Sequence, residues 1–275
     1  MSVMCDTLGV TRSGYYAHSA RPPSARAARQ AAIVERIREA HAGSGGLYGS
    51  PRVTAELRAA GTTVNEKAVA GLMRRHGIRS KVARKFRPRT TDSGHAHPVA
   101  DNLLGRDFSA KAPNARWCSD ITYIPTDEGW LYLAAVVDLC SRRVVGWSMA
   151  GHMRAGLCVE ALEMAVTHRR PGAGLIHHSD RGVQYCCNDY RGRLDELGFV
   201  PSMSGKGDCY DNAAMESFWG TLKRELVYLR PGGRFASHEE ARRTIFWYIE
   251  VFYNRRRRHS AIGYKSPEEF EAGRN

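Results

Sequence analysis

The sequence predicts an α/β protein in which a mixed sheet with flanking helices follows an all-α helix-turn-helix domain. Two observations support this fold class. Three consecutive runs in the second part of the chain are rich in β-branched and aromatic residues, and helical and strand-like patterns then alternate. The first third instead contains short helical patterns bounded by capping residues, glycines and prolines.

Charge is distributed unevenly along the chain. Residues 1–106 contain 18 Lys and Arg against 7 Asp and Glu, whereas residues 107–275 contain 23 against 21, within a total formal charge of +13. A basic first third predicts a polyanionic partner, and nucleic acid is the leading candidate. The alternative is a basic surface that serves only solubility.

Composition narrows the class of protein further. The apolar fraction of 43% is enough for a buried core, and no apolar run has the length of a membrane span. The N-terminus has no apolar leader, and the seven cysteines are scattered without a Cys-x-x-Cys pair. We therefore expect free thiols in a reducing cytoplasm and no membrane partner.

The first domain is expected to bind DNA. Residues 1–25 resemble the tail of a partial helix-turn-helix segment, and 26–86 predict a complete helix-turn-helix domain. Within it, Ser50 is the expected N-cap of the second helix and Asn65 that of the third. Basic residues on and after the third helix would meet phosphates: Arg74, Arg75, Arg79, Lys81, Arg84, Lys85, Arg87 and Arg89. The alternative is a helical hairpin with a solvated basic face. Residues 87–108 lack periodicity and predict a linker.

The second domain, residues 109–230, is expected to hold the mixed sheet. Strands are predicted at 117–124, 130–139, 143–149, 175–178 and 199–203, and helices at 154–169, 190–197 and from Asn212, the expected N-cap of the last helix. Residues 231–275 predict a basic helical extension, with a helix over 239–253 followed by Arg255, Arg256, Arg257 and Arg258. These four arginines either end a helix in solvent or hold DNA.

Three acidic residues occupy positions from which they could converge. Asp120 lies inside the first predicted strand, Asp180 just after the fourth, and Glu216 on the first turn of the last helix. If the first and fourth strands are neighbours, the two aspartates share a crevice at one edge of the sheet. Converging carboxylates repel one another unless hard cations neutralise them, so the pattern predicts a site for Mg²⁺, with two ions about 3.5–4 Å apart. The alternative is that the aspartates are ordinary turn or edge residues.

A pair of histidines and a glycine-rich stretch lie near these acids in the sequence. His177 and His178 suggest zinc, but no second pair of ligands stands at zinc spacing, and one of the two is expected to pack within its strand. The stretch 204–211 is rich in glycine, and Ser204 and Lys206 could donate hydrogen bonds to a DNA backbone that approaches closely. The alternative is a flexible surface loop.

Five sequence blocks, in order, resemble one known family. They are LGVTRSGYY, the helical block GLYGSPRVTAELRAAG with VNEKAVAGLMRRHGI, WCSDITYI with HHSDRGVQY, SMSGKGDCYDNAAMESFWGTLKRE, and FYNRRRRHSAIGYKSPEEF. The chain resembles the downstream-frame (OrfB-type) transposases of bacterial insertion sequences, whose "DDE" catalytic domain is similar to retroviral integrases. The 35 residues between Asp180 and Glu216 match that family's spacing. The resemblance implies a ribonuclease-H-like fold with Asp120, Asp180 and Glu216 as catalytic metal ligands, and Lys223 as the family's basic residue that touches a phosphate.

The resemblance also implies an activity and partners. The activity is strand cleavage and strand transfer at the ends of an insertion sequence, with Mg²⁺ or Mn²⁺, in an active complex that is a homo-oligomer on terminal-repeat and target DNA. Asp208 and Asp211 do not occupy the family's catalytic positions. The short N-terminus lacks heptads, so we hypothesise that an upstream-frame protein acts as fusion or partner. Full affinity and specificity of the isolated chain for terminal repeats would contradict this hypothesis. The alternatives are a non-catalytic DNA-binding regulator and a metal-dependent nuclease.

Overall fold

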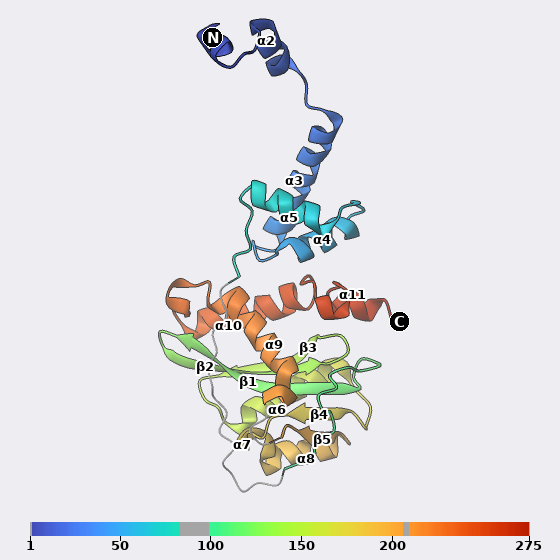
Figure 1. The fold of residues 1–275 in the computed structure, drawn as a ribbon. Coiled ribbons are helices and arrows are strands. Elements are labelled where there is room, and N and C mark those ends of the chain that lie inside the picture. The colour runs from blue at the N-terminus through green and yellow to red at the C-terminus, as the bar shows by residue number, and fades with distance from the viewer. Residues whose placement is uncertain (1, 83–98, 206–208, 275) are drawn as a thin grey trace. The chain divides into compact units, whose positions relative to one another are not determined.

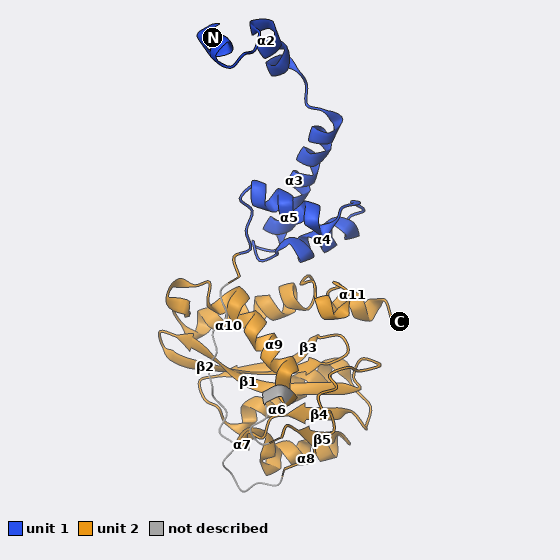
Figure 2. Ribbon diagram, in the orientation of Figure 1, with its two compact units in different colours: residues 1–80 blue, residues 81–275 orange. Residues whose placement is uncertain are grey.

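The computed structural model describes residues 2–82, 99–205 and 209–274 (Figure 1). The chain divides into two compact units, residues 1–80 and 81–275 (Figure 2). Among the described residues, no helix is both long and apolar enough to cross a membrane.

The first unit is entirely helical. Its elements are α1 (Ser2–Thr7), α2 (Arg12–Ala20), α3 (Ala25–Gly43), α4 (Ser50–Ala59) and α5 (Glu66–Arg75). Helices α3, α4 and α5 share a small core made of Val34, Ile37, Val53, Leu57, Val69, Leu72 and Met73. The helices therefore meet along the apolar faces that their spacing predicts.

The helix caps of this unit follow the sequence signals with one exception. The Asn65 side chain accepts a hydrogen bond from the Ala68 N–H at 2.7 Å, as predicted for the start of α5. Ser50, however, is the first helical residue of α4 and Gly49 is its N-cap, without a side-chain capping bond. The prediction that Ser50 caps this helix is therefore wrong by one residue, while Pro51 lies in the first turn as expected.

The second unit contains a five-stranded mixed sheet in the order β3-β2-β1-β4-β5. The strands are β1 (Arg116–Thr126), β2 (Gly129–Asp138), β3 (Val144–Ala150), β4 (Ile176–Ser179) and β5 (Val200–Met203). The first three are antiparallel hairpin partners, whereas β4 pairs with β1, and β5 with β4, in parallel. The expectation that the first and fourth strands are neighbours is confirmed.

Helices cover both faces of this sheet (Figure 1). On one face lie α6 (Ala155–Arg169), α7 (Val183–Cys186) and α8 (Asn188–Glu196), which pack on a core that includes Trp117, Val136, Leu162 and Tyr190. Gly146 lets α6 approach closely, because a Cβ there would collide with the Ala161 carbonyl oxygen. The other face carries α9 (Ala213–Leu222), α10 (His238–Trp247) and α11 (Pro267–Ala272).

The last residues of the predicted linker belong to the second unit. Residues 83–98 lie outside the described part of the chain, but the segment 99–108 packs against β5. Leu104 is buried, the Leu103 N–H donates to Ser202 Oγ at 3.0 Å, and the Met203 N–H donates to the Asp101 carbonyl at 3.2 Å. This backbone therefore has fixed partners close to the acidic residues.

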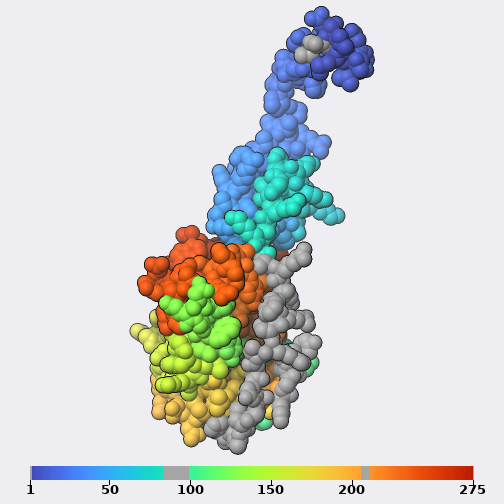
Figure 3. Space-filling model, turned by 90° about the vertical axis from the view of Figure 1, so that its left-hand side faces the viewer, coloured from blue at the N-terminus to red at the C-terminus, as the bar shows by residue number. Residues whose placement is uncertain are grey.

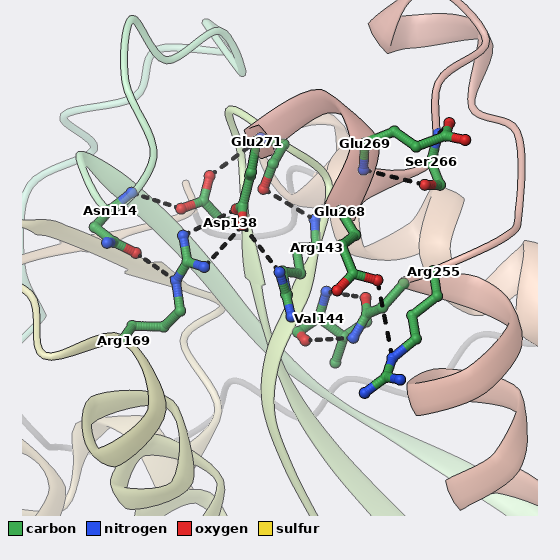
Figure 4. A network of polar contacts seen from close by, with 12 residues as sticks. Asn114, Asp138, Arg143, Val144, Arg169, Arg255, Ser266, Glu268, Glu269 and Glu271 are labelled. Carbon is green, nitrogen blue, oxygen red and sulfur yellow. Dashed lines mark hydrogen bonds and ion pairs between the residues drawn. The ribbon is translucent and has the colours of Figure 1, made fainter. Parts of the chain in front are cut away.

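The C-terminal helix is anchored by an ion-pair network (Figure 4). Glu271 accepts two hydrogen bonds from Arg169 on α6, at 2.8 and 2.9 Å, and one from Arg143 at 3.0 Å. Arg169 also donates to Asn114 Oδ1 at 2.9 Å, and the Asn114 N–H donates to the buried Asp138 at 2.6 Å. Helix α11 is thus tied to α6 and to the turn after β2.

A buried ion pair joins the two helical segments of the C-terminal part. Helix α9 continues into a π-helical segment, Lys223–Val227, and α10 continues into another, Tyr248–Tyr253. Glu225 in the first segment receives hydrogen bonds from Arg257 at 2.7 and 2.8 Å and from the Tyr248 hydroxyl at 2.9 Å. The prediction that all four arginines hold DNA is wrong for Arg257, because its side chain lies in the interior with this carboxylate.

We expect Arg257→Met to destabilise the second unit by about 3–5 kcal/mol, because Glu225 would remain buried without its cation. Arg256→Met changes the neighbouring exposed arginine and is expected to shift stability by less than about 0.5 kcal/mol. The measurement is urea denaturation followed by tryptophan fluorescence. Equal effects from the two variants would contradict the buried role of Arg257.

Candidate active site

Parallel pairing of β1 with β4 brings two of the acidic residues to one edge of the sheet. The paired register ends at Ser119 opposite Ser179. The residue that follows each of these serines is an aspartate, namely Asp120 within β1 and Asp180 just past the end of β4. Both carboxylates therefore lie at the carboxyl end of β4, where α/β sheets commonly place ligands.

Two donors hold the carboxylate of Asp120. Its Oδ1 accepts a hydrogen bond from the Ile121 N–H at 2.8 Å, and its Oδ2 accepts one from the Trp219 indole Nε1–H at 3.0 Å. Trp219 lies on α9 and is 6% exposed. Helical spacing marks Trp219 only as an apolar residue of this helix, so the sequence did not predict this contact. The sequence signal for this contact is the position of Trp219 three residues after Glu216, which places the two side chains on neighbouring sides of one helix.

Asp180 is held by the tight turn that follows β4. Its Oδ1 accepts a hydrogen bond from the Gly182 N–H at 2.9 Å. A Cβ on residue 182 would lie 3.0 Å from the same oxygen, so a side chain at this position would crowd the Asp180 carboxylate. The neighbouring Arg181 donates to the Ser204 carbonyl at 2.6 Å and links the turn to the end of β5.

Glu216 lies on helix α9, and Lys223 is the first residue after this helix. Glu216 is exposed on the first turn, whereas Lys223 is half-buried. Burial lowers the pKa of the Lys223 amine, and the negative charge of Asp120 opposes that shift. The ammonium group therefore feels the field of Asp120, so one helix brings both Trp219 and Lys223 to this aspartate.

The acids repel one another in the metal-free protein. Burial and the charge of Asp180, together with a smaller contribution from Glu216, raise the pKa of Asp120 to about 8, although the bonds from Ile121 and Trp219 oppose the shift. Among the described residues, no three His, Cys, Asp or Glu side chains already stand close enough to share one ion. The donors are nevertheless all carboxylate oxygens, which suit Mg²⁺ or Mn²⁺. The two aspartates are held by fixed donors at this edge, whereas Glu216 is exposed on α9.

Both histidines of β4 are buried and do not face the acids as ligands. His177 Nε2 lies 2.9 Å from Ser119 Oγ and 3.1 Å from the Tyr190 hydroxyl. His178 Nδ1 lies 2.9 Å from Ser202 Oγ. Burial lowers the pKa of His177 to about 3 and that of His178 to about 4, so both are neutral at pH 7. Their role is to connect β4 with its neighbours.

Asp211 ties together the ends of the glycine-rich stretch 204–211. This buried carboxylate accepts hydrogen bonds from the Gly205 N–H and from Asn102 Nδ2, both at 2.8 Å. Lys206 lies outside the described residues. The expected N-cap bond of Asn212 is not made, because its side-chain oxygen accepts from the Cys118 thiol at 3.2 Å and a 3₁₀ turn precedes α9.

The basic residues expected to contact DNA have different surroundings. Arg74 and Arg75 are exposed in the last turn of α5, within the first unit. Arg255 and Arg256 are exposed after the second π-helical segment. Arg258 is half-buried and donates to Glu269 at 2.9 Å, so it also helps to hold α11.

Known proteins are similar to this chain in sequence. Profiles described as an integrase core domain match residues 110–209 and 197–267, and an HTH-like domain matches 28–86. The chain is 47% identical over 273 residues to "Transposase InsF for insertion sequence IS3A" of Escherichia coli (strain K12), which covers 98% of this chain and 93% of that protein. The fold and the site thus define a DDE-type polynucleotidyl transferase with an integrase core. The chain belongs to the IS3 family of insertion-sequence transposases.

Two solved structures align with this chain at low sequence identity. A chain of the simian T-cell lymphotropic virus intasome in complex with PP2A regulatory subunit B56 gamma aligns with a TM-score of 0.51 at 15% identity, covering 86% of this chain and 74% of that one. The HTLV-2 integrase catalytic core domain in complex with magnesium aligns with a TM-score of 0.45 at 15% identity, covering 59% of this chain and 99% of that one.

We expect the stability of the metal-free protein to fall as pH rises from about 5 to about 8. The folded pKa of Asp120, about 8, lies above its ordinary value of 3.8, so the folded state binds the extra proton in this range and loses that advantage when the carboxyl ionises. Asp120→Asn should remove this decline, whereas Asp189→Asn, at an exposed position on α8, should retain it. Urea denaturation in EDTA across this range is the measurement, and parallel pH profiles for wild type and Asp120→Asn would contradict the assignment.

Proposed function

We propose that this transposase cleaves DNA at the ends of its insertion sequence and joins those ends to target DNA, with Asp120, Asp180 and Glu216 as the catalytic acids. Membership of the IS3 transposase family implies DNA transposition as the process. The observation that supports the residue assignment is the parallel register of β1 and β4, which sets two mutually repelling aspartates at one edge of the sheet. A site that concentrates negative charge in this way is suited to a phosphodiester only when cations are also present.

We propose Mg²⁺ or Mn²⁺ as the cofactor, in a two-ion arrangement. Asp120 and Asp180 would hold the ions, and Glu216 would complete the set from α9. Bound ions of this kind activate an attacking oxygen and stabilise the leaving oxygen of a phosphoryl transfer. The protein's own contribution is positioning, since Ile121 and Trp219 fix Asp120 and the Gly182 amide fixes Asp180.

The DNA contacts are assigned by exposure and charge. Arg74 and Arg75 would meet phosphates of the terminal repeats, while Lys223 and the exposed Arg255 and Arg256 would meet phosphates near the acids. Lys206 stays a proposed contact from the sequence alone. We further propose cytoplasmic action in a homo-oligomer on DNA, with an upstream-frame protein as fusion or partner.

Glu216→Gln should abolish strand cleavage and strand transfer while DNA binding persists, because the amide keeps the shape and loses the charge that holds a cation. The assay uses labelled element-end DNA, a plasmid target and Mg²⁺ or Mn²⁺, with binding measured by fluorescence anisotropy. Cutting without joining, lost in the variant, would indicate a nuclease. Full activity of the variant would exclude Glu216 from the catalytic set, and an inactive wild type that still binds DNA would favour the regulator.

Trp219→Phe should lower the strand-transfer rate by about 10- to 100-fold and raise the Mg²⁺ concentration needed for half-maximal rate, because Asp120 loses a donor that orients it. Trp147→Phe is the matched control. Trp147 also donates its indole N–H to a carboxylate, Glu250 at 2.8 Å, but it lies on β3, two strands from Asp120 in the sheet. A lower rate with an unchanged Mg²⁺ requirement would contradict the positioning role of Trp219.

A further inference from the structure

Two large aromatic side chains of α10 are open to solvent. Phe246 is 51% exposed and Trp247 is 49% exposed, in a helix whose opposite side packs in the core. Phe246 rests edge-on against Trp147 of β3, with ring centroids 6.0 Å apart, and Trp247 stacks on Phe252, also at 6.0 Å. Figure 3 shows the C-terminal part of the second unit (orange), to which α10 belongs, at the surface beside the β1–β2 hairpin (bright green). The two rings therefore form a supported and exposed α10 aromatic surface.

Charged residues flank the α10 aromatic surface. Arg243 stands three residues before Phe246 and four before Trp247, a spacing that puts side chains on one side of a helix. It is exposed and forms no ion pair with any residue that the structure describes. Glu250 stands three residues after Trp247. Its Oε1 accepts a hydrogen bond from the Trp147 indole at 2.8 Å, so Glu250 projects from the side that carries Phe246.

The charges around this surface favour a protein over a nucleic acid as its partner. Exposed rings supported by their neighbours suit both kinds of partner. A DNA backbone would meet the carboxylates of Glu239 and Glu250 on α10 and its continuation, whereas Arg242 is directed to the Met149 carbonyl of β3. A protein can instead place an opposite charge against both Arg243 and Glu250 while the rings pack between them.

We infer that the α10 aromatic surface is a two-fold contact between two copies of the chain, in which α10 packs antiparallel on α10 of the second copy. This inference rests on the proposed homo-oligomer and names the surface that holds it together. A two-fold axis between Phe246 and Trp247 sets the Arg243 of each copy beside the Glu250 of the other, because Arg243 precedes and Glu250 follows the aromatic pair by the same number of residues. Two copies joined in this way carry two acidic sites, one for each end of the insertion sequence.

The first test measures the mass of the full-length chain by sedimentation velocity, with and without an element-end duplex. Wild type should form a dimer in at least one of these conditions. Trp247→Ala should raise the dimer dissociation constant by about 10- to 100-fold, because a tryptophan at the centre of an interface carries a large share of the affinity. Trp130→Ala is the matched control and should leave the mass unchanged, since Trp130 is 55% exposed on β2 and also packs edge-on against a ring, that of Tyr123.

The charge pairs allow a second, more specific test. Arg243→Glu and Glu250→Arg should each weaken the dimer, because each variant sets like charges opposite one another across the axis. An equimolar mixture of the two variants should recover a dimer, because both charge contacts in the mixed pair again join opposite charges. Recovery on mixing also shows that neither variant has unfolded.

Three results would overturn the two-fold contact. They are a wild type that stays monomeric with and without DNA, no recovery of a dimer on mixing, and a loss of DNA affinity in Trp247→Ala at unchanged mass, which would indicate a nucleic-acid contact. A wild-type oligomer that none of these variants changes would also overturn this surface but leave the proposed homo-oligomer intact. Failure of the proposed catalysis is a separate result, namely strand transfer that persists in Glu216→Gln, a variant that should keep the wild-type mass.

Discussion

The short parallel pairing between β1 and β4 is the constraint on which the catalytic unit depends. It joins a strand from the antiparallel hairpins to one that follows α6, and its register ends with aspartates as the next residues. Backbone hydrogen bonds thus fix the spacing of two side chains far apart in sequence. The rest of the sheet holds the two carboxylates together against their mutual repulsion. This edge of the sheet therefore favours the binding of cations.

Elements that stabilise the unit also position its reactive groups. Helix α9 buries Met215, Phe218 and Leu222 against the sheet, and the same packing delivers the Trp219 indole to Asp120. The π-helical segment after α9 is held by the buried pair of Glu225 and Arg257. The orientation of an acid on β1 is therefore linked, through one continuous helix, to the packing of the C-terminal part.

Local pattern was sufficient to predict the strands and most helices. The β-branched and aromatic residues of 130–139 and the capping residue Asn65 are local signals, and the structure has a strand at Gly129–Asp138 and the Asn65 cap bond. Convergence of the two aspartates required only the assumption that the first and fourth strands pair. Glu216 was a candidate from its position on the first turn of the last helix, and the family resemblance matched it to the third acid. The individual roles of these residues remain predictions.

Contacts between distant segments could not be predicted in the same way. Periodicity marks Trp219 as apolar but does not say which acid its N–H meets. Four consecutive arginines look equivalent in sequence, although Arg257 faces a buried carboxylate two helical segments away. Asn212 has the residue type of an N-cap, but the Cys118 thiol donates to its side chain instead. Such choices depend on tertiary packing that no local window contains.

The burial of Arg257 changes what the run of arginines offers to a nucleic acid. Each phosphate neutralised by an exposed cation on duplex DNA releases about 0.9 counterions, and this release sets the salt dependence of binding. Arg257 is buried against Glu225 and Arg258 is half-buried against Glu269, whereas Arg255, paired with Glu268 at the surface, and Arg256 are exposed. The run's share of the ionic-strength slope is thus closer to two ions than to four. Part of the basic charge counted along this chain therefore serves as internal structure.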